Sequence, residues 1–168
     1  MGTLVERLAA AQIGGTFNQY RDTRLADRLE RYLAARVDAP LLLVGEAAGY
    51  RGARVSGIPF TSERQLTGTG PTEATATIVH RVLAELGLEA SVLLWNVVPT
   101  HPGTESTNRV PTRGEIEAAV PFACELARRR RVLAVGRVAE AALGVPYVRH
   151  PSHGGASAFR ETLRVCLS

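Results

Sequence analysis

Four short apolar runs divide the chain and predict the strands of one sheet. They cover residues 41–44, 91–96, 131–136 and 146–149, and each is bounded by polar or turn-forming residues. Runs of this length that are apolar at nearly every position are typical of strands buried on both faces. The pattern therefore indicates a sheet with layers of structure on both sides.

Stretches with helical periodicity lie between these runs. Residues 24–36 place Leu25, Leu29 and Leu33 on one face and follow the capping pair Asp22-Thr23. Further helices are expected at about 72–86, from Thr112 to about 130, at 138–143 and at 156–165, with Thr112 and Glu115 forming a capping box. Strands that alternate with helices predict an α/β fold, a three-layer α/β/α sandwich around a four-stranded parallel sheet.

The length and apolar content favour one domain spanning 1–168, with an N-terminal helical segment (1–38) before the core (39–168). No apolar run approaches the ~20 residues of a membrane span, so no membrane partner is expected. The first residues lack a basic start followed by an apolar stretch. We therefore expect a cytoplasmic protein, and a monomer.

The basic residues are all arginine: 20 of them, and no lysine. This excludes Schiff-base chemistry on a lysine, a phosphate-loop lysine and a lysine general base. Aspartate occurs only at positions 22, 27 and 38, so acid or base chemistry further along must fall to glutamate or histidine.

The net charge of +4 is unevenly distributed. From Arg128 to the end, eight arginines face only Glu140 and Glu161. Guanidinium groups match phosphate oxygens well, and this asymmetry favours a polyanion as partner. A GC-rich coding bias is the alternative explanation for arginine in place of lysine.

Polar side chains with chemical capacity follow three of the four predicted strands, at the edge where parallel sheets bind ligands. Glu46 is placed to orient or deprotonate a water, although it could instead cap backbone amides. Asn96 offers a donor and an acceptor to a planar ligand, or forms a turn. His150 can donate to a developing anion. His153 is either solvated or in contact with phosphate.

An aromatic residue, Phe60, lies in a loop outside any periodic face, where stacking on a ligand competes with ordinary packing. His80 and His101 are expected to be surface or structural residues. The histidine spacings match no common metal motif, and two cysteines, Cys124 and Cys166, cannot form a four-thiolate site. A GxSxG nucleophile elbow is missing as well. We therefore expect no metal and no cofactor.

Five motifs together resemble the uracil-DNA glycosylase superfamily, and most closely its bacterial GEAPG-type branch. The likeness covers about residues 41–160 in the family's order and spacing. The motifs are GEAAG at 45–49, GIPF at 57–60, LWNVVP at 94–99, NRVPT at 108–112 and HPS at 150–152. The resemblance implies a four-stranded parallel sheet between helices, and an enzyme that flips uracil out of DNA and hydrolyses its N-glycosidic bond.

The resemblance also implies roles for individual residues. Phe60 stacks on uracil, Asn96 binds its Watson–Crick edge, His150 stabilises the departing anion, and Glu46 positions water. The remaining substrate contacts fall to Gly45, Ala47 and Tyr50, and the DNA contacts to Ser152, His153, Gly154, Gly155, Arg109 and Arg51. The partner implied is DNA that contains uracil, single- or double-stranded.

This sequence departs from the branch at several positions. Of the four cysteines that hold an iron–sulfur cluster in the branch, only Cys124 has a counterpart, so no cluster is expected. Ala48 replaces a proline, and Arg51-Gly52 replace an acidic pair. Gly49 stands where other members carry a tyrosine that blocks thymine's methyl group, and Tyr50 is a candidate substitute.

Three hypotheses result. The first is a monofunctional uracil-DNA glycosylase without lyase activity, because no lysine is available to attack the sugar. The second is a degenerate member that binds uracil-containing or abasic DNA without turnover, as the changes at Ala48 and Arg51 suggest. The third is an unrelated α/β enzyme that acts on a free nucleoside or nucleotide.

Overall fold

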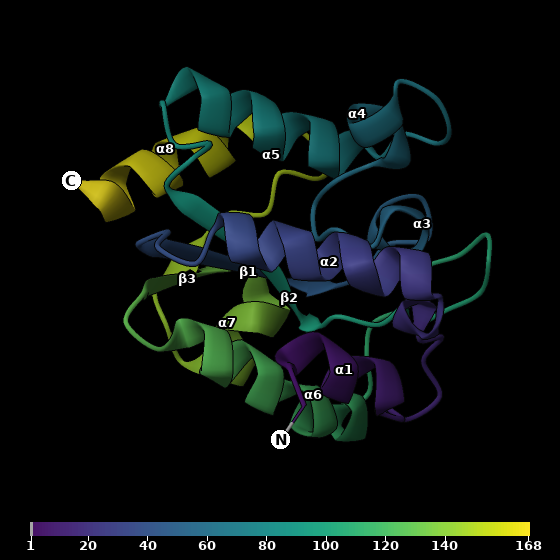
Figure 1. Ribbon diagram of the computed structural model, residues 1–168. Coiled ribbons are helices and arrows are strands. Elements are labelled where there is room, and N and C mark those ends of the chain that lie inside the picture. The colour runs from purple at the N-terminus through teal and green to yellow at the C-terminus, as the bar shows by residue number, and fades with distance from the viewer. Residues whose placement is uncertain (1) are drawn as a thin grey trace.

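The structure is a computed structural model, and it describes residues 2–168. Four parallel strands form one sheet in the order β2-β1-β3-β4 (Figure 1). The strands are β1 (Leu41–Ala47), β2 (Val92–Val98), β3 (Arg131–Val135) and β4 (Tyr147–Val148). The predicted α/β architecture with a four-stranded parallel sheet is confirmed.

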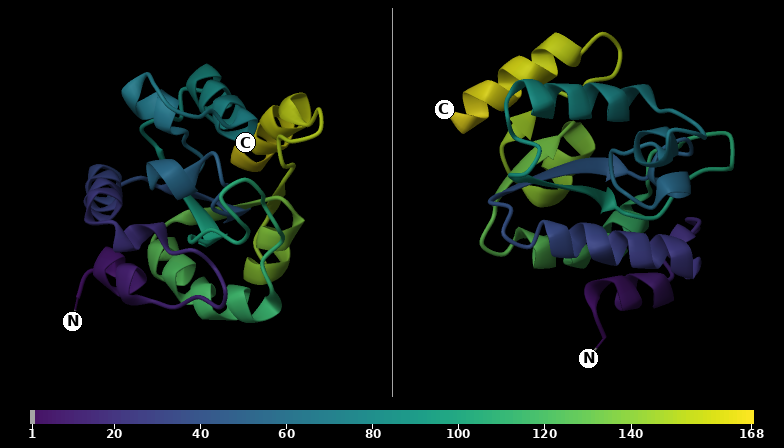
Figure 2. Two further views of the ribbon diagram at one scale, coloured as in Figure 1. Left: turned by 90° about the vertical axis from the view of Figure 1, so that its right-hand side faces the viewer. Right: turned by 45° about the horizontal axis from the view of Figure 1, so that its top comes forward.

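Helices cover both faces of this sheet, as the views in Figures 1 and 2 show. All predicted helices are present with ends shifted by a few residues. The helices of the described residues are α1 (Leu4–Ala10), the 3₁₀ helix η1 (Gln19–Arg21), α2 (Thr23–Ala35), α3 (Ala53–Ser56), α4 (Glu63–Thr67), α5 (Ala74–Glu85), α6 (Arg113–Ala127), α7 (Arg137–Leu143) and α8 (Ala156–Leu167).

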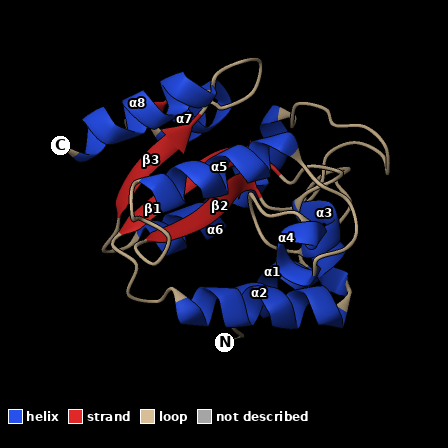
Figure 3. Cartoon of the chain, turned by 90° about the horizontal axis from the view of Figure 1, so that it is seen from above, coloured by secondary structure: helices blue, strands red, loops and turns tan. Residues whose placement is uncertain are grey.

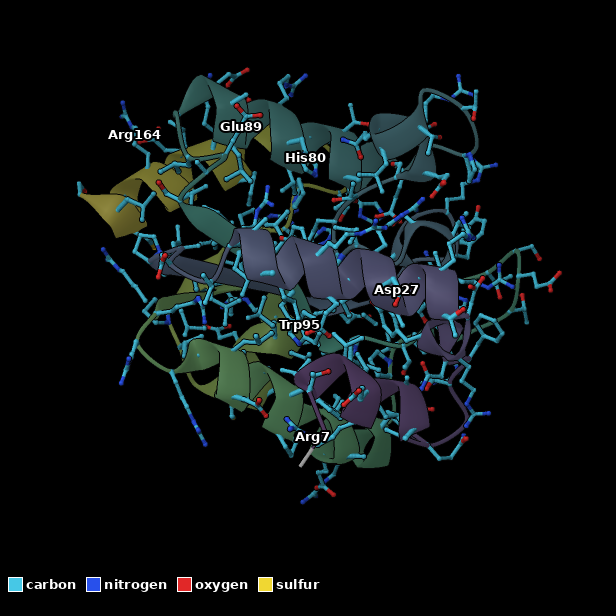
Figure 4. All side chains as sticks on the ribbon, viewed as in Figure 1. Arg7, Asp27, His80, Glu89, Trp95 and Arg164 are labelled. Atoms are coloured by element: carbon cyan, nitrogen blue, oxygen red, sulfur yellow. The ribbon has the colours of Figure 1, made fainter. Side chains whose placement is uncertain are left out.

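The alternation of side chains along each strand sorts the core into two layers. Leu42 and Val44 of β1 pack with α1, α2, α6 and α7 on one face. Leu41 and Leu43 pack with α5 and α8 on the other face, and Figure 3 shows α5 lying over β1 and β2. Trp95 of β2 is fully buried in the first layer (Figure 4). The segment before residue 39 thus shares its core with the sheet.

The structure differs from the predicted elements in three places. β1 runs three residues further than predicted and β2 two residues further, because the ladder continues through the pairs Gly45↔Asn96 and Ala47↔Val98. The long loop predicted after β1 contains the short helices α3 and α4. α1 lies within the predicted N-terminal helical segment but was not predicted as a separate helix, although Thr3 and Glu6 form a capping box at its start.

Four of the eight arginines counted from Arg128 onward lie away from the carboxyl ends of the strands. Arg128 to Arg131 lie before and at the start of β3, at the amino ends of the strands. Arg130 donates hydrogen bonds to the carbonyls of Ala39, Leu126, Arg36 and Val37. Arg130 therefore connects the ends of α2 and α6, a structural role for one arginine of this cluster. Among residues 2–168, no helix is long and apolar enough to cross a membrane.

Candidate active site

A cavity of about 380 Å³ opens at the carboxyl ends of the strands, where parallel sheets generally bind ligands. It brings together side chains from β1, β2, α5 and the loops that follow the strands. The lining residues are Glu46, Ala47, Ala48, Gly49, Ala53, Phe60, Glu73, Thr75, Asn96, Pro102, Asn108, Arg109, His150 and His153. Seven sequence-predicted site residues are among them: Glu46, Ala47, Phe60, Asn96, Arg109, His150 and His153.

Asn96 and Phe60 line the cavity, and both side chains lie against Gly45. Asn96 projects from β2 on the α5 side of the sheet, and its register partner in β1 is Gly45. A Cβ atom on Gly45 would lie 2.2 Å from Cζ of Phe60 and 2.9 Å from Oδ1 of Asn96. Glycine is therefore required here, because it lets the aromatic ring and the amide approach the same point of the strand.

Phe60 is held in an unusual backbone conformation, with φ of 52°. The hydroxyl of buried Ser56 supports the turn before it, since it donates to the Thr61 carbonyl at 2.6 Å and accepts from the Ile58 N–H at 3.0 Å. Backbone strain at a non-glycine residue persists only where the surrounding structure enforces it. The loop thus fixes the Phe60 ring against Gly45, where a planar ligand can stack on it.

Asn96 is nearly fully buried, with 3 % of its surface exposed. Within residues 2–168, no hydrogen bond to its side-chain amide is present, although the amide faces a polar cavity. The amide is reachable from the cavity, so its donor and acceptor are available to a ligand there.

Glu46 lies in β1 and not beyond it, and its half-buried carboxylate faces the cavity. Burial raises its pKa above the ordinary value for glutamate. No arginine forms an ion pair with it in the part of the chain that the structure describes. A desolvated carboxylate of this kind is a better base than one in water, and it can hold a water molecule for attack.

His150 lines the cavity two residues after the end of β4. Two neighbouring residues, Arg149 and Ser152, affect the protonation state of its ring. The backbone N–H of Ser152 donates to its Nδ1 at 3.1 Å, so Nδ1 is an acceptor. Burial, followed by the positive charge of Arg149, lowers the pKa of His150. The ring is therefore neutral at pH 7 with its proton on Nε2, a tautomer that can donate one hydrogen bond to a ligand.

Arg109 is positioned at the cavity by Glu115 of α6. The guanidinium makes two hydrogen bonds to this carboxylate, at 2.8 and 2.7 Å. Glu115 also accepts from the backbone N–H groups of Thr112 and Gly15 and is almost fully buried. The guanidinium of Arg109 beside it holds the pKa of Glu115 at about 2. The ion pair thus fixes one cationic group at the cavity wall.

Glu115→Ala should lower the free energy of unfolding by about 2–3 kcal/mol at pH 7, since the Arg109 guanidinium and two backbone donors lose a buried acceptor. Because the folded-state pKa is depressed, this stabilisation is present above the ordinary carboxyl pKa and is lost as the pH falls towards 2. Urea unfolding at pH 7 and at pH 3 measures the difference. Glu117→Ala is the control, because its exposed carboxylate pairs only with Arg113. Equal losses in both variants at pH 7 would contradict the assignment.

Two hydrogen-bonded residues connect the loops around the cavity. His101 is fully buried, and its ring nitrogens contact the carbonyl oxygens of Ala48 and Thr104, each at 2.7 Å. His101 is thus a structural residue and not a surface one. Asn108 accepts from the backbone N–H of Tyr50 at 2.9 Å. The loop after β2 is thereby fastened to the loop after β1.

Other predicted residues surround the cavity without lining it. The Arg51 guanidinium lies over the Tyr50 ring, 5.6 Å from its centroid. Tyr50 does not line the cavity, so it does not take the place of the tyrosine that other family members carry at the position of Gly49. The hydroxyl of Ser152 contacts Nδ1 of both His150 and His153. Gly154 and Gly155 lead into α8, whose first turn has no side-chain cap.

Sequence reasoning missed Glu73, which also lines the cavity. An acidic residue in the first turn of a predicted helix has an ordinary explanation, a favourable interaction with the helix dipole, so the residue alone gave no signal. Its place at the end of the loop that follows β1 was the one available indication. Among residues 2–168, no group of three histidine, cysteine, aspartate or glutamate side chains could hold a metal ion.

Comparisons with known proteins identify the family of the chain. A family model described as the uracil DNA glycosylase superfamily matches residues 33–164. The crystal structure of wild-type SMUG2 from Pedobacter heparinus has a similar fold, with a TM-score of 0.67 at 13 % sequence identity, covering 99 % of this chain and 97 % of that one. A search of curated proteins found no match to the sequence. Because the family model spans most of the chain, the protein belongs to the uracil-DNA glycosylase superfamily.

Proposed function

We propose that the protein is a monofunctional uracil-DNA glycosylase that hydrolyses the N-glycosidic bond of uracil in DNA. The observation that carries the proposal is the convergence of Glu46, Phe60, Asn96 and His150 on one cavity. That cavity combines an aromatic ring, an unpaired amide, an N–H donor and a desolvated carboxylate, the groups needed to hold a flipped base and break its bond to the sugar.

In the proposed mechanism, uracil stacks on Phe60 and its Watson–Crick edge bonds to the amide of Asn96. The backbone at Gly45 and Ala47 borders the ring. The bond between C1′ and N1 breaks, and its electron pair leaves with uracil. The Nε2–H of His150 donates to the resulting anion, and its strengthened hydrogen bond lowers the barrier. Glu46 orients a water towards the cationic sugar and accepts its proton, which gives a free base and an abasic site.

The DNA strand is proposed to contact the rim of the cavity. His153 and Arg109 line the opening, and Ser152, Gly154 and Gly155 form the turn before α8. The uncapped amides at the start of this 12-residue helix suit a phosphate oxygen. Arg51 is exposed beside Tyr50 and adds a second cation near the opening. These contacts would position the backbone while the base enters the cavity.

The experiment that tests the proposal measures free uracil released from single- and double-stranded oligonucleotides with one uracil, alongside the binding of the same DNA. The proposal expects uracil release, with the strand intact until alkali cleaves the abasic site, because the chain has no lysine for an imine. Binding without release would favour a degenerate family member. Activity confined to free deoxyuridine or its nucleotides would favour a nucleoside enzyme.

Glu46→Gln should abolish most turnover and leave DNA binding within about threefold, because the amide retains the size of the side chain but cannot accept the water's proton. In the wild type, release should decline as the pH is lowered, starting above the ordinary glutamate pKa, since burial raises the pKa of Glu46. Single-turnover rates from pH 4 to 8 measure both effects. A Glu46→Gln rate equal to wild type would assign water activation to another group.

A further inference from the structure

Glu73 contributes a second carboxylate to the cavity from an unusual position. It occupies the N-cap of α5, but its side chain makes no capping hydrogen bond and lines the cavity. Its backbone is fixed in place, because the Glu73 N–H donates to the hydroxyl of fully buried Ser62 at 2.9 Å. The carboxylate is therefore directed into the cavity by a well-anchored segment.

The carboxylate of Glu73 occupies space that two glycines leave free. A Cβ atom on Gly49 would lie 2.3 Å from its Oε2, and one on Gly52 would lie 2.2 Å from the same oxygen. Real Cβ atoms do not approach an oxygen so closely, so both positions must be glycine for Glu73 to adopt this place. Glu73 thus forms the part of the cavity wall that side chains at positions 49 and 52 would otherwise form.

This carboxylate has no structural partner in the described chain. The partly buried Glu63 and the buried Glu115 are each paired with an arginine, whereas no ion pair or hydrogen bond to the Glu73 carboxylate is present within residues 2–168. Desolvation by burial raises its pKa. A partly desolvated carboxylate that faces a cavity and has no protein partner is placed to accept a hydrogen bond from a ligand.

We propose that Glu73 is a specificity-determining residue, whose carboxylate accepts a hydrogen bond from an O–H or N–H group on the edge of the base that Asn96 does not contact. This inference rests on the proposed function, in which Asn96 takes the Watson–Crick edge of a pyrimidine. The edge that remains carries C5. A hydroxyl at C5 would donate to Glu73, whereas a methyl group of similar size would desolvate the carboxylate without giving a hydrogen bond.

The test compares 5-hydroxyuracil with thymine in the same oligonucleotide. Wild-type protein should favour 5-hydroxyuracil in kcat/KM by about 100-fold or more, because an unmatched buried acceptor strongly rejects the analogue that lacks the donor. In Glu73→Ala this ratio should fall at least about tenfold, through faster thymine release. Glu73→Gln, which keeps the volume and one acceptor, should still exclude thymine. Comparing each variant with wild type cancels the intrinsic difference between the two leaving groups.

Glu117→Ala is the control, because its carboxylate is exposed on α6 and should leave the ratio unchanged. Binding of oligonucleotides with a 2′-fluorinated sugar, which resist hydrolysis, separates the two proposals. If wild-type protein binds the 5-hydroxyuracil oligonucleotide more tightly than the thymine oligonucleotide and Glu73→Ala does not, this inference is supported even where no base is released. The absence of base release would overturn only the hydrolase function. An unchanged ratio in both binding and release for Glu73→Ala would overturn the role of Glu73, whatever the activity.

Discussion

Asn96→Ala should reduce the single-turnover rate of uracil release by about 10²–10³-fold, the loss typical of removing a donor that strengthens as negative charge develops. The amide lies buried beside Phe60 and is unpaired among the described residues. It can therefore bond to uracil without first giving up a bond within the protein, so its removal affects the reaction directly.

Stability measurements distinguish this loss of function from a loss of fold. Removing an unpaired amide from an apolar strand should leave the free energy of unfolding within about 1 kcal/mol of wild type. Asn96→Asp keeps the size of the side chain but places a negative charge next to the departing anion, and it should be at least as slow. Near-normal uracil release by both variants would disprove the base-binding role of Asn96.

His150→Ala should also lower the rate of uracil release by about 10²–10³-fold, because the anion loses its N–H donor. The structure specifies the donor as Nε2, since Nδ1 already accepts from the Ser152 N–H. His150→Gln offers an amide N–H at a comparable distance from the backbone and should recover part of the rate. The lowered pKa keeps the ring neutral, so wild-type activity should show no transition at the ordinary histidine pKa.

Single-turnover rates for the two His150 variants from pH 5 to 9 check this account. Equal rates for His150→Ala and wild type would contradict it. Equal defects in His150→Ala and His150→Gln would show that the ring is needed for something other than a donated hydrogen bond. A loss of activity as the pH is raised through the ordinary histidine pKa would instead favour a charged imidazolium.

The fold was predictable because the strands are strongly apolar and the helices are periodic. The strand ends were not, since β1 continues three residues past its apolar run, through Glu46 to Ala47, and β2 continues two residues past Asn96. A polar residue at the rim of a sheet ends an apolar pattern without ending the strand. α1 was missed because a seven-residue helix gives a weak periodic signal, even with its capping box.

The site was partly predictable for a similar reason. Glu46, Asn96 and His150 follow or end apolar runs, and topology alone brings the ends of parallel strands to one edge. Glu73 comes from the start of a helix on the other side of a long loop, so its approach to Gly49 depends on how that loop folds. Short-range sequence patterns contain no information on such a contact.

The central claim is that the cavity between Phe60, Asn96 and His150 holds uracil flipped from DNA. A crystal structure of the wild-type protein with an oligonucleotide that contains 2′-fluoro-2′-deoxyuridine tests it most directly, because the fluorinated sugar resists hydrolysis. We expect the uracil ring stacked on Phe60, its Watson–Crick edge bonded to Asn96, and His150 Nε2 within about 3.2 Å of a uracil oxygen. Uracil left in the DNA stack, or bound outside this cavity, would contradict the account.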